Sequence, residues 1–196
     1  AVERAGTKLV VVVGLVVAAI GLLLMTRLTA HSGYVIPVLA AILVAGLGMG
    51  LTLSPSTEAI MGSLPRQEAG VGSAMNGTNI QVGGALGVAV LGSVLNGRYR
   101  SWLSPTMALL HLPKAAAHIA RSSLGGGLSI ASHLPAAAAS QLAASAKASF
   151  VAGVNLADLL AMSVVLTGAL VALAFLPARA RMPAERTSHA DAHPEL

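Results

Sequence analysis

The sequence has no cysteine, and of its 196 residues only 3% are aromatic and 10% are charged. Without cysteine, a disulfide framework and any metal site built on thiolates are excluded. A soluble domain carries roughly 25% charged residues, so this chain has too few charges to cover a surface that faces water. What it has in abundance is hydrophobic residues, at 55%, and this composition places it among membrane proteins.

The formal net charge of +5 is the one feature that points towards nucleic acid. The basic residues are scattered through polar connections and the two ends, which is typical of the water-facing edges of a membrane protein. We therefore expect no nucleic-acid partner. The chain opens AVERAGTK, with no initiator methionine and no signal peptide before its first apolar run. This opening suggests a piece of a longer protein.

Four apolar stretches are long enough to cross a bilayer, which takes about 20 residues of helix. Backbone amides in lipid must be satisfied within the segment, so these stretches are expected to be helices. The predicted fold is therefore all-α, a polytopic membrane protein with four transmembrane spans at about residues 9–26, 34–54, 71–95 and 150–176.

The polar segments complete the predicted organisation. Residues 1–176 form one partial helical bundle, in which residues 96–149 are a long extracytoplasmic loop anchored at the interface by Tyr99 and Trp102. Parts of this loop, such as residues 107–123, can form helices that lie on the membrane surface. Residues 177–196 are predicted to be a disordered cytoplasmic tail. Cytoplasmic segments of membrane proteins carry an excess of lysine and arginine, but here the segments on the two sides of the membrane carry equal numbers. Long loops count little in this positive-inside rule, and discounting the middle of residues 96–149 favours a cytoplasmic start and tail.

The stretch AGLGMGLTLSPSTEAIM, residues 45–61, combines three glycines with a proline. Its spacing fails the phosphate-binding pattern G-x-G-x-x-G, because the sixth position from Gly46 or Gly48 is a leucine. In a membrane span, glycine instead lets helix backbones approach closely. Gly46 and Gly50 form a G-x-x-x-G pair with Gly48 between them. Pro55 predicts a kink or a restart of the helix near the end of the span.

The third span carries amide side chains among small residues. Asn76 and Asn79 gather with small residues on one face of the helix, and Gln81 lies on a second face. Either these amides hold helices together by hydrogen bonds, or they line a water-filled path and contact a solute. Three further glycines of this span are predicted to pack against neighbouring helices: Gly83, Gly84 and Gly87.

Asp158 is the one acidic residue in the last span. A carboxylate inside the membrane is a candidate proton carrier. Asn155, three residues earlier, instead suggests a capped helix start with Asp158 in its first turn, and this interpretation is preferred. The histidines fall in the connections and the tail without metal-binding spacing. We therefore predict no metal site, no catalytic residue and no enzymatic activity.

Residues 46–93 resemble the C-terminal half of the fourteen-span drug:proton antiporters of the major facilitator superfamily. The resemblance rests on a G-x-G-x-G-L-x-x-x-P helix end, a P-x-x-x-A-G elbow and an N-x-x-x-Q-x-G-G-x-x-G helix, whose asparagine corresponds here to Asn76 or Asn79. The opening ERAGTK is similar to the end of the cytoplasmic loop motif D-R-x-G-R-K, with Glu3 in the place of the acid. The chain would then correspond to spans 11–14, within the C-terminal bundle of such a transporter.

This resemblance implies proton-driven export of drugs or amphipathic organic compounds across the inner membrane of a bacterium. Its energy source would be the proton gradient, with no cofactor. The partners implied are the lipid bilayer, the remaining helices of the same transporter and a small amphipathic organic substrate. The second and third spans would line the central cavity, which favours Asn76, Asn79 and Gln81 as contacts along the substrate path.

Two further expectations follow. Glu58 is predicted to pair with Arg4 or Arg66 as a cytoplasmic latch, next to the loop motif that contains Glu3. The alternatives to drug export are export of an endogenous metabolite or lipid by the same fold, and a standalone four-span membrane scaffold or subunit.

Overall fold

The computed structural model describes residues 7–26, 35–62 and 65–176, and these residues are almost all helical, without strands. The predicted tail, residues 177–196, lies outside the described residues. Four long helices are long and apolar enough to cross a membrane, which confirms the predicted all-α polytopic fold. They are α2 (Thr7–Thr26), α3 (Val35–Gly62), α4 (Ala69–Leu109) and α7 (Ala136–Phe175). Three short elements complete the chain: η1 (Arg66–Glu68), α5 (Lys114–Ser122) and α6 (Leu124–Ala131).

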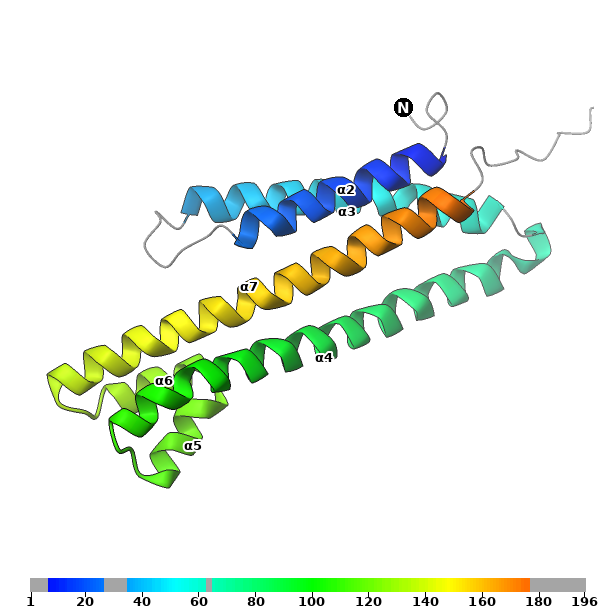
Figure 1. Cartoon of the computed structure of the whole chain (residues 1–196). Helices are drawn as coiled ribbons and strands as arrows, with labels where there is room; N and C mark the ends of the chain where they lie inside the picture. Colours follow the sequence, from blue (N-terminus) through cyan, green and yellow to red (C-terminus); the bar gives the residue numbers. More distant parts are fainter. Residues whose placement is uncertain (1–6, 27–34, 63–64, 177–196) are drawn as a thin grey trace, which may run out of the picture.

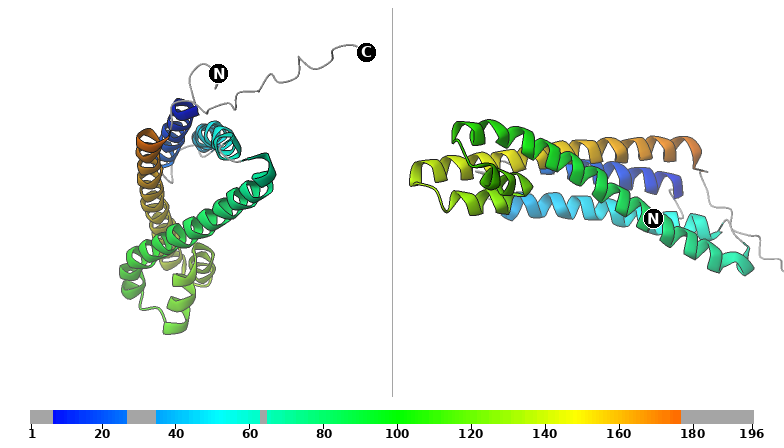
Figure 2. Two further views of the ribbon diagram at one scale, coloured as in Figure 1. Left: turned by 90° about the vertical axis from the view of Figure 1, so that its right-hand side faces the viewer. Right: turned by 90° about the horizontal axis from the view of Figure 1, so that it is seen from below.

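The long helices run alternately in opposite directions (Figure 1). Helix α2 packs against α3 on one side and α7 on the other, and α4 packs against α7. Contact between α3 and α4 is slight. Helices α5 and α6 lie at the end of the bundle opposite Thr7 and Phe175 (Figures 1 and 2).

The segment 96–149, expected as a loop, is largely helical. Helix α4 continues to Leu109, and α7 begins at Ala136, well before residue 150. Tyr99, Leu103 and Met107 explain the extension of α4, because residues four apart share one face of a helix and all three are buried. The run AAAASQLAASAKAS consists mostly of strong helix formers, which explains the early start of α7.

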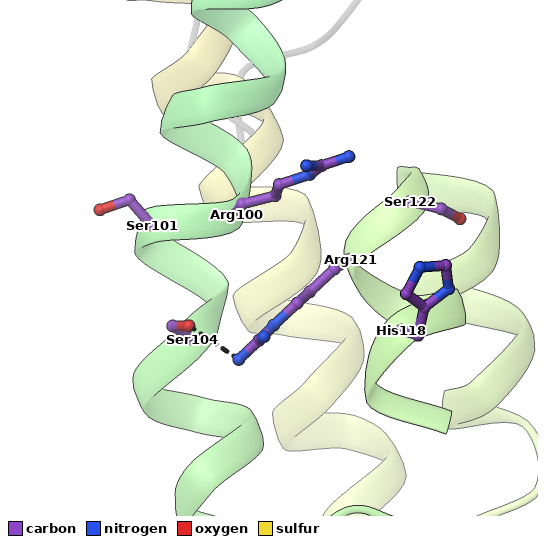
Figure 3. Close-up of a pocket in the computed structure, with 6 residues that line it drawn as sticks. All are labelled: Arg100, Ser101, Ser104, His118, Arg121 and Ser122. Atoms are coloured by element: carbon purple, nitrogen blue, oxygen red, sulfur yellow. Dashed lines mark hydrogen bonds between the residues drawn. The ribbon is translucent and has the colours of Figure 1, made fainter. Parts of the chain in front are cut away.

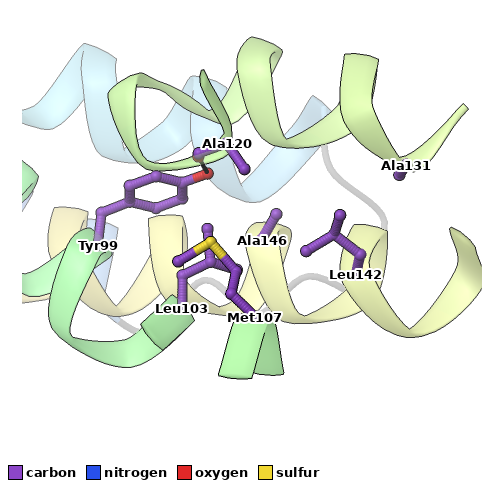
Figure 4. Close-up of a cluster of buried hydrophobic side chains, with 7 residues drawn as sticks. All are labelled: Tyr99, Leu103, Met107, Ala120, Ala131, Leu142 and Ala146. Atoms are coloured by element: carbon purple, nitrogen blue, oxygen red, sulfur yellow. Dashed lines mark hydrogen bonds between the residues drawn. The ribbon is translucent and has the colours of Figure 1, made fainter. Parts of the chain in front are cut away.

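These extensions build a small helical unit outside the predicted spans, which we call the cap (residues 96–149). Its core consists of Tyr99, Leu103, Met107, Ala120, Ala131, Leu142 and Ala146 (Figure 4). The Tyr99 hydroxyl lies 2.9 Å from the carbonyl oxygen of Ala120 and 3.0 Å from that of Ser123. Tyr99 is therefore a core residue of the cap, and the prediction that it anchors the chain at the interface is wrong. Trp102 remains 49% exposed.

Candidate functional site

The amide side chains of α4 lie along a helix that is open over most of its length. Asn76 is half-buried, and its Nδ2 donates a long hydrogen bond of 3.5 Å to Thr57 Oγ1 on α3. Asn79 and Gln81 are exposed. Because they are two residues apart on a helix, these two side chains point in roughly opposite directions. Asn76 and Asn79 thus share a face, and Gln81 does not join them.

A hollow of ≈ 480 Å³ lies beside Asn79. Its lining comes from α4 alone: Gly70, Val71, Ala74, Met75, Thr78 and Asn79. A site that encloses a small molecule needs walls on several sides. In the described part of the chain, this hollow has one wall, and it is therefore an open depression on the surface of α4 rather than a closed pocket.

The close contact between α2 and α3 is made by small residues. A Cβ atom placed on Gly48 would overlap the backbone nitrogen of Ala18 and would lie 2.6 Å from the carbonyl oxygen of Gly14. In the same seam, a Cβ on Gly21 would lie 2.5 Å from the backbone nitrogen of Ala45. The glycines of α2 were not singled out from the sequence. The signal was present, because small residues recur in α2 at positions 14, 18 and 21.

The other glycines predicted to pack helices face open space in this chain. A Cβ on any of them would meet nothing within 4 Å: Gly46, Gly50, Gly83, Gly84 and Gly87. Their role in packing stays a prediction, and it concerns contacts beyond those described here.

Pro55 lies inside α3, which continues without a restart to Gly62. Hydroxyl groups around it bond to carbonyl oxygens four residues back, from Thr52 to Gly48 at 2.8 Å and from Ser56 to Thr52 at 2.7 Å. Such bonds help a membrane helix to accommodate a proline. Because α3 is unbroken here, Glu58 lies in its last part, where its side chain is exposed.

The predicted latch around Glu58 stays a prediction. Glu3 and Arg4 lie outside the described residues, and the side chain of Arg66 is not among the described groups.

Asp158 is placed differently from the preferred interpretation. Helix α7 is unbroken from Ala136 to Phe175, so Asn155 is not a cap and Asp158 is not in a first turn. The residue lies about 33 Å along the helix from Ala136 at 1.5 Å per residue. Its Oδ2 is buried and has no hydrogen-bond partner within the described chain. Asp158 is therefore a carboxyl group in the middle of a membrane helix, and its interpretation as part of a capped helix start is wrong.

The described residues contain no group of three or more histidine or acidic side chains that could hold a metal ion. No family model matches the chain, and no solved structure matches it significantly.

Curated proteins do match. The chain is 35% identical over 176 residues to the multidrug efflux pump LfrA of Mycolicibacterium smegmatis, which covers 89% of this chain and 34% of the pump. It is 34% identical over 176 residues to the tetracenomycin C resistance and export protein of Streptomyces glaucescens, covering 88% of the chain and 32% of that protein. A triacylglyceride transporter of Mycolicibacterium smegmatis is 33% identical over 99 residues, 46% of the chain and 18% of the transporter.

The chain thus spans about a third of the length of the first two relatives, both of which are named as exporters. The long match, the four apolar helices and the glycine and proline motifs of residues 46–93 agree with one another. This chain belongs to the drug-efflux antiporter family of the major facilitator superfamily.

Proposed function

We propose that this chain supplies C-terminal membrane helices to a proton-driven exporter of drugs and other amphipathic organic compounds in the bacterial inner membrane. The observation that carries the proposal is the match over 176 residues to a multidrug efflux pump and to an antibiotic export protein. Transport would need the remaining helices of the same protein, because the chain spans only about a third of these relatives. The proton gradient would supply the energy, without a cofactor.

The open side of α4 supports this proposal. The most apolar stretch of α4 has no buried residue, whereas 28% of the corresponding stretch of α2 is buried. Polar side chains on a membrane helix normally face other helices or a water-filled cavity. The exposed amides of Asn79 and Gln81 are therefore suited to a seam with other helices or to a substrate path. Asn76, held by Thr57, would form the wall between α3 and α4.

Asp158 is suited to carry the proton. Its Oδ2 is buried within the membrane part of α7 without a hydrogen-bond partner in the described chain. A carboxyl group in such a place can bind a proton and release it as its surroundings change. We therefore include Asp158 in the proposal as the proton-binding group of these four helices.

The test is efflux of a cationic dye from cells that express the full-length transporter containing this chain. Changing Asn76, Asn79 or Gln81 to alanine should lower efflux or change the range of dyes exported. The matched control is Gln141→Ala, which removes an exposed amide from the cap. If all three variants export every dye like the unchanged protein, the proposed path is wrong.

Coupling is tested in the same cells. An uncoupler should stop efflux of the unchanged protein, and Asp158→Asn should abolish uphill efflux while downhill exchange of dye continues. Uphill efflux that survives the uncoupler would contradict the proton-driven mechanism. Uphill efflux by Asp158→Asn at the normal rate would remove Asp158 from it.

Export of a lipid is the second candidate, because one relative is named as a triacylglyceride transporter. Accumulation of a neutral lipid inside cells that lack the full-length protein, with unchanged dye efflux, would favour it. A standalone scaffold is not favoured, since the relatives are named for transport and export.

A further inference from the structure

The cap contains a second feature, a pocket of ≈ 420 Å³ between α4 and α5. Six residues line it: Arg100, Ser101, Ser104, His118, Arg121 and Ser122. In Figure 3, the side chain of Arg100 extends from α4 towards α5, and that of Arg121 extends from α5 towards α4. Arg121 donates a hydrogen bond of 3.1 Å from Nη2 to the hydroxyl of Ser104. The pocket is therefore lined by hydrogen-bond donors from two helices.

The positive charge of this pocket has no counterpart in the cap. Residues 96–149 include five lysines and arginines and three histidines but no aspartate or glutamate. The acids of the described chain lie elsewhere: Glu58 at the end of α3, Glu68 before α4, and Asp158 within α7. Arginine side chains that line one pocket are often paired with carboxylate or phosphate groups. The described residues offer these arginines no such group.

The length of α4 places the pocket near the lipid headgroups. Between Glu68 and Arg98 the helix runs through 29 residues without a charge. At 1.5 Å per residue this uncharged stretch is about 43 Å long. A bilayer with its headgroup regions is about 40–45 Å thick. The guanidinium of Arg98 also lies 4.6 Å from the ring centre of Trp102, a residue type enriched at the membrane interface.

We propose that the pocket between α4 and α5 binds a phosphate group, taken from the headgroup of an anionic phospholipid or from phosphate in solution. Arg100 and Arg121 present planar guanidinium groups that match the oxygens of phosphate, and each can donate two parallel hydrogen bonds. The ring of His118 adds a further donor on the α5 side, whereas the hydroxyl of Ser122 already donates to the carbonyl oxygen of Ile119 at 2.7 Å. The proposal depends on the cap and does not rest on the proposed transport function.

The test uses the whole chain, reconstituted in nanodiscs of phosphatidylcholine. In one series, inorganic phosphate replaces chloride at constant ionic strength. In the other, phosphatidylglycerol replaces a rising fraction of the phosphatidylcholine. The readout is the fluorescence of Trp102, the only tryptophan, with the melting temperature as a second measurement. A ligand that binds only the folded state raises this temperature.

We expect a saturable response to at least one probe. Arg100→Gln should weaken it by about tenfold, the loss of one charge-assisted pair. This variant leaves the bond between Arg121 and Ser104 in place, so the cap should keep its fold, which circular dichroism checks. The double variant Arg100→Gln/Arg121→Gln should abolish the response. The matched control is Lys114→Gln/Lys147→Gln, which removes two charges from the cap outside the pocket lining.

The outcomes separate the possibilities. A response to phosphatidylglycerol alone identifies a lipid headgroup as the ligand, and a response to inorganic phosphate alone identifies a soluble anion. If neither probe gives a response, the proposal is wrong. It is also wrong if the lysine variant weakens the response as much as the arginine variants, because the cap would then attract anions only through its overall charge.

Discussion

At the scale of single residues, Gly48 shows most directly how this fold depends on the absence of a side chain. Gly48→Ala would place a methyl group against the backbone of Ala18, and α2 and α3 would have to separate. We expect a loss of about 1–3 kcal/mol in the free energy of unfolding, as for other overpacked positions. Thermal unfolding of the reconstituted chain measures it.

Gly46→Ala is the control for this change, two residues away on the same helix. It adds a methyl group where nothing lies within 4 Å. Alanine is the better helix former by about 0.5–1 kcal/mol, so this variant should be as stable as the unchanged chain or more stable. Equal losses at both positions would show that the seam is not where the structure places it.

The sequence predicts that glycines bring these helices together, but it does not identify which ones. Helix α3 is apolar on every side, so its sequence does not show how it is rotated about its own axis. The G-x-x-x-G pattern predicts contacts at Gly46 and Gly50, whereas in the structure Gly48 between them faces α2. The position of Asp158 within its helix is not evident from the sequence either. An asparagine three residues earlier suits a cap, and only the unbroken course of α7 excludes it.

Tyr99 carries the polar contact at the centre of the cap. Tyr99→Phe removes the hydroxyl that faces the carbonyl oxygens of Ala120 and Ser123. The carbonyl of Ser123 keeps the backbone N–H of Gly127 as a donor, so the loss falls mainly on the carbonyl of Ala120. A buried carbonyl group that loses its donor costs about 1–3 kcal/mol. We expect faster hydrogen exchange of the amides in α5 and α6, with the membrane helices unaffected. Trp102→Phe, at an exposed position, is the control and should leave this exchange unchanged.

At the scale of elements, the cap is held together by the part of α7 that precedes the predicted span. Leu142 is fully buried there, and Leu142→Ala should destabilise the cap by about 2–5 kcal/mol. Leu109→Ala is the matched control, because this leucine of the cap is 65% exposed. Limited proteolysis in nanodiscs should cut the first variant between α4 and α7 and spare the second. Equal resistance of both variants would contradict the described core.

The four membrane spans are readable from hydropathy, because a bilayer demands long uncharged helices. The sequence does not predict the folded cap, because alanine, serine and glycine dominate residues 96–149 and suggest a loop of low complexity. One signal was available in the spacing of Tyr99, Leu103 and Met107, four residues apart on one helix face. The pairing of Asn76 with Thr57 was not readable, because it depends on how two distant helices meet.

At the scale of the whole molecule, the alternating helices place η1 and the cap at opposite ends of the bundle (Figure 1), and we therefore expect them on opposite sides of the membrane. The chain has no cysteine, so single cysteines can report this directly. Gln67→Cys should react with a membrane-impermeant maleimide only from the cytoplasmic side, and Ser132→Cys only from the outside. Both positions are exposed.

Labelling in intact cells and in inverted vesicles distinguishes the outcomes. Exchange of the two sides would reverse the expected orientation and keep the fold. Labelling of both cysteines from one side would contradict the arrangement of the four helices.

Helices α4 and α7 each continue from the membrane into the cap without interruption, and this continuity has a mechanical consequence. Within the cap, the Thr106 hydroxyl bonds to that of Ser145 at 2.9 Å, which ties the two rods together at one end. Figure 2 shows them diverging away from that end. The two helices are therefore joined at one end only, and this joint lies in the cap, outside the bilayer. Because α4 is about 60 Å long, a change of 10° at that joint would move its far tip by about 10 Å.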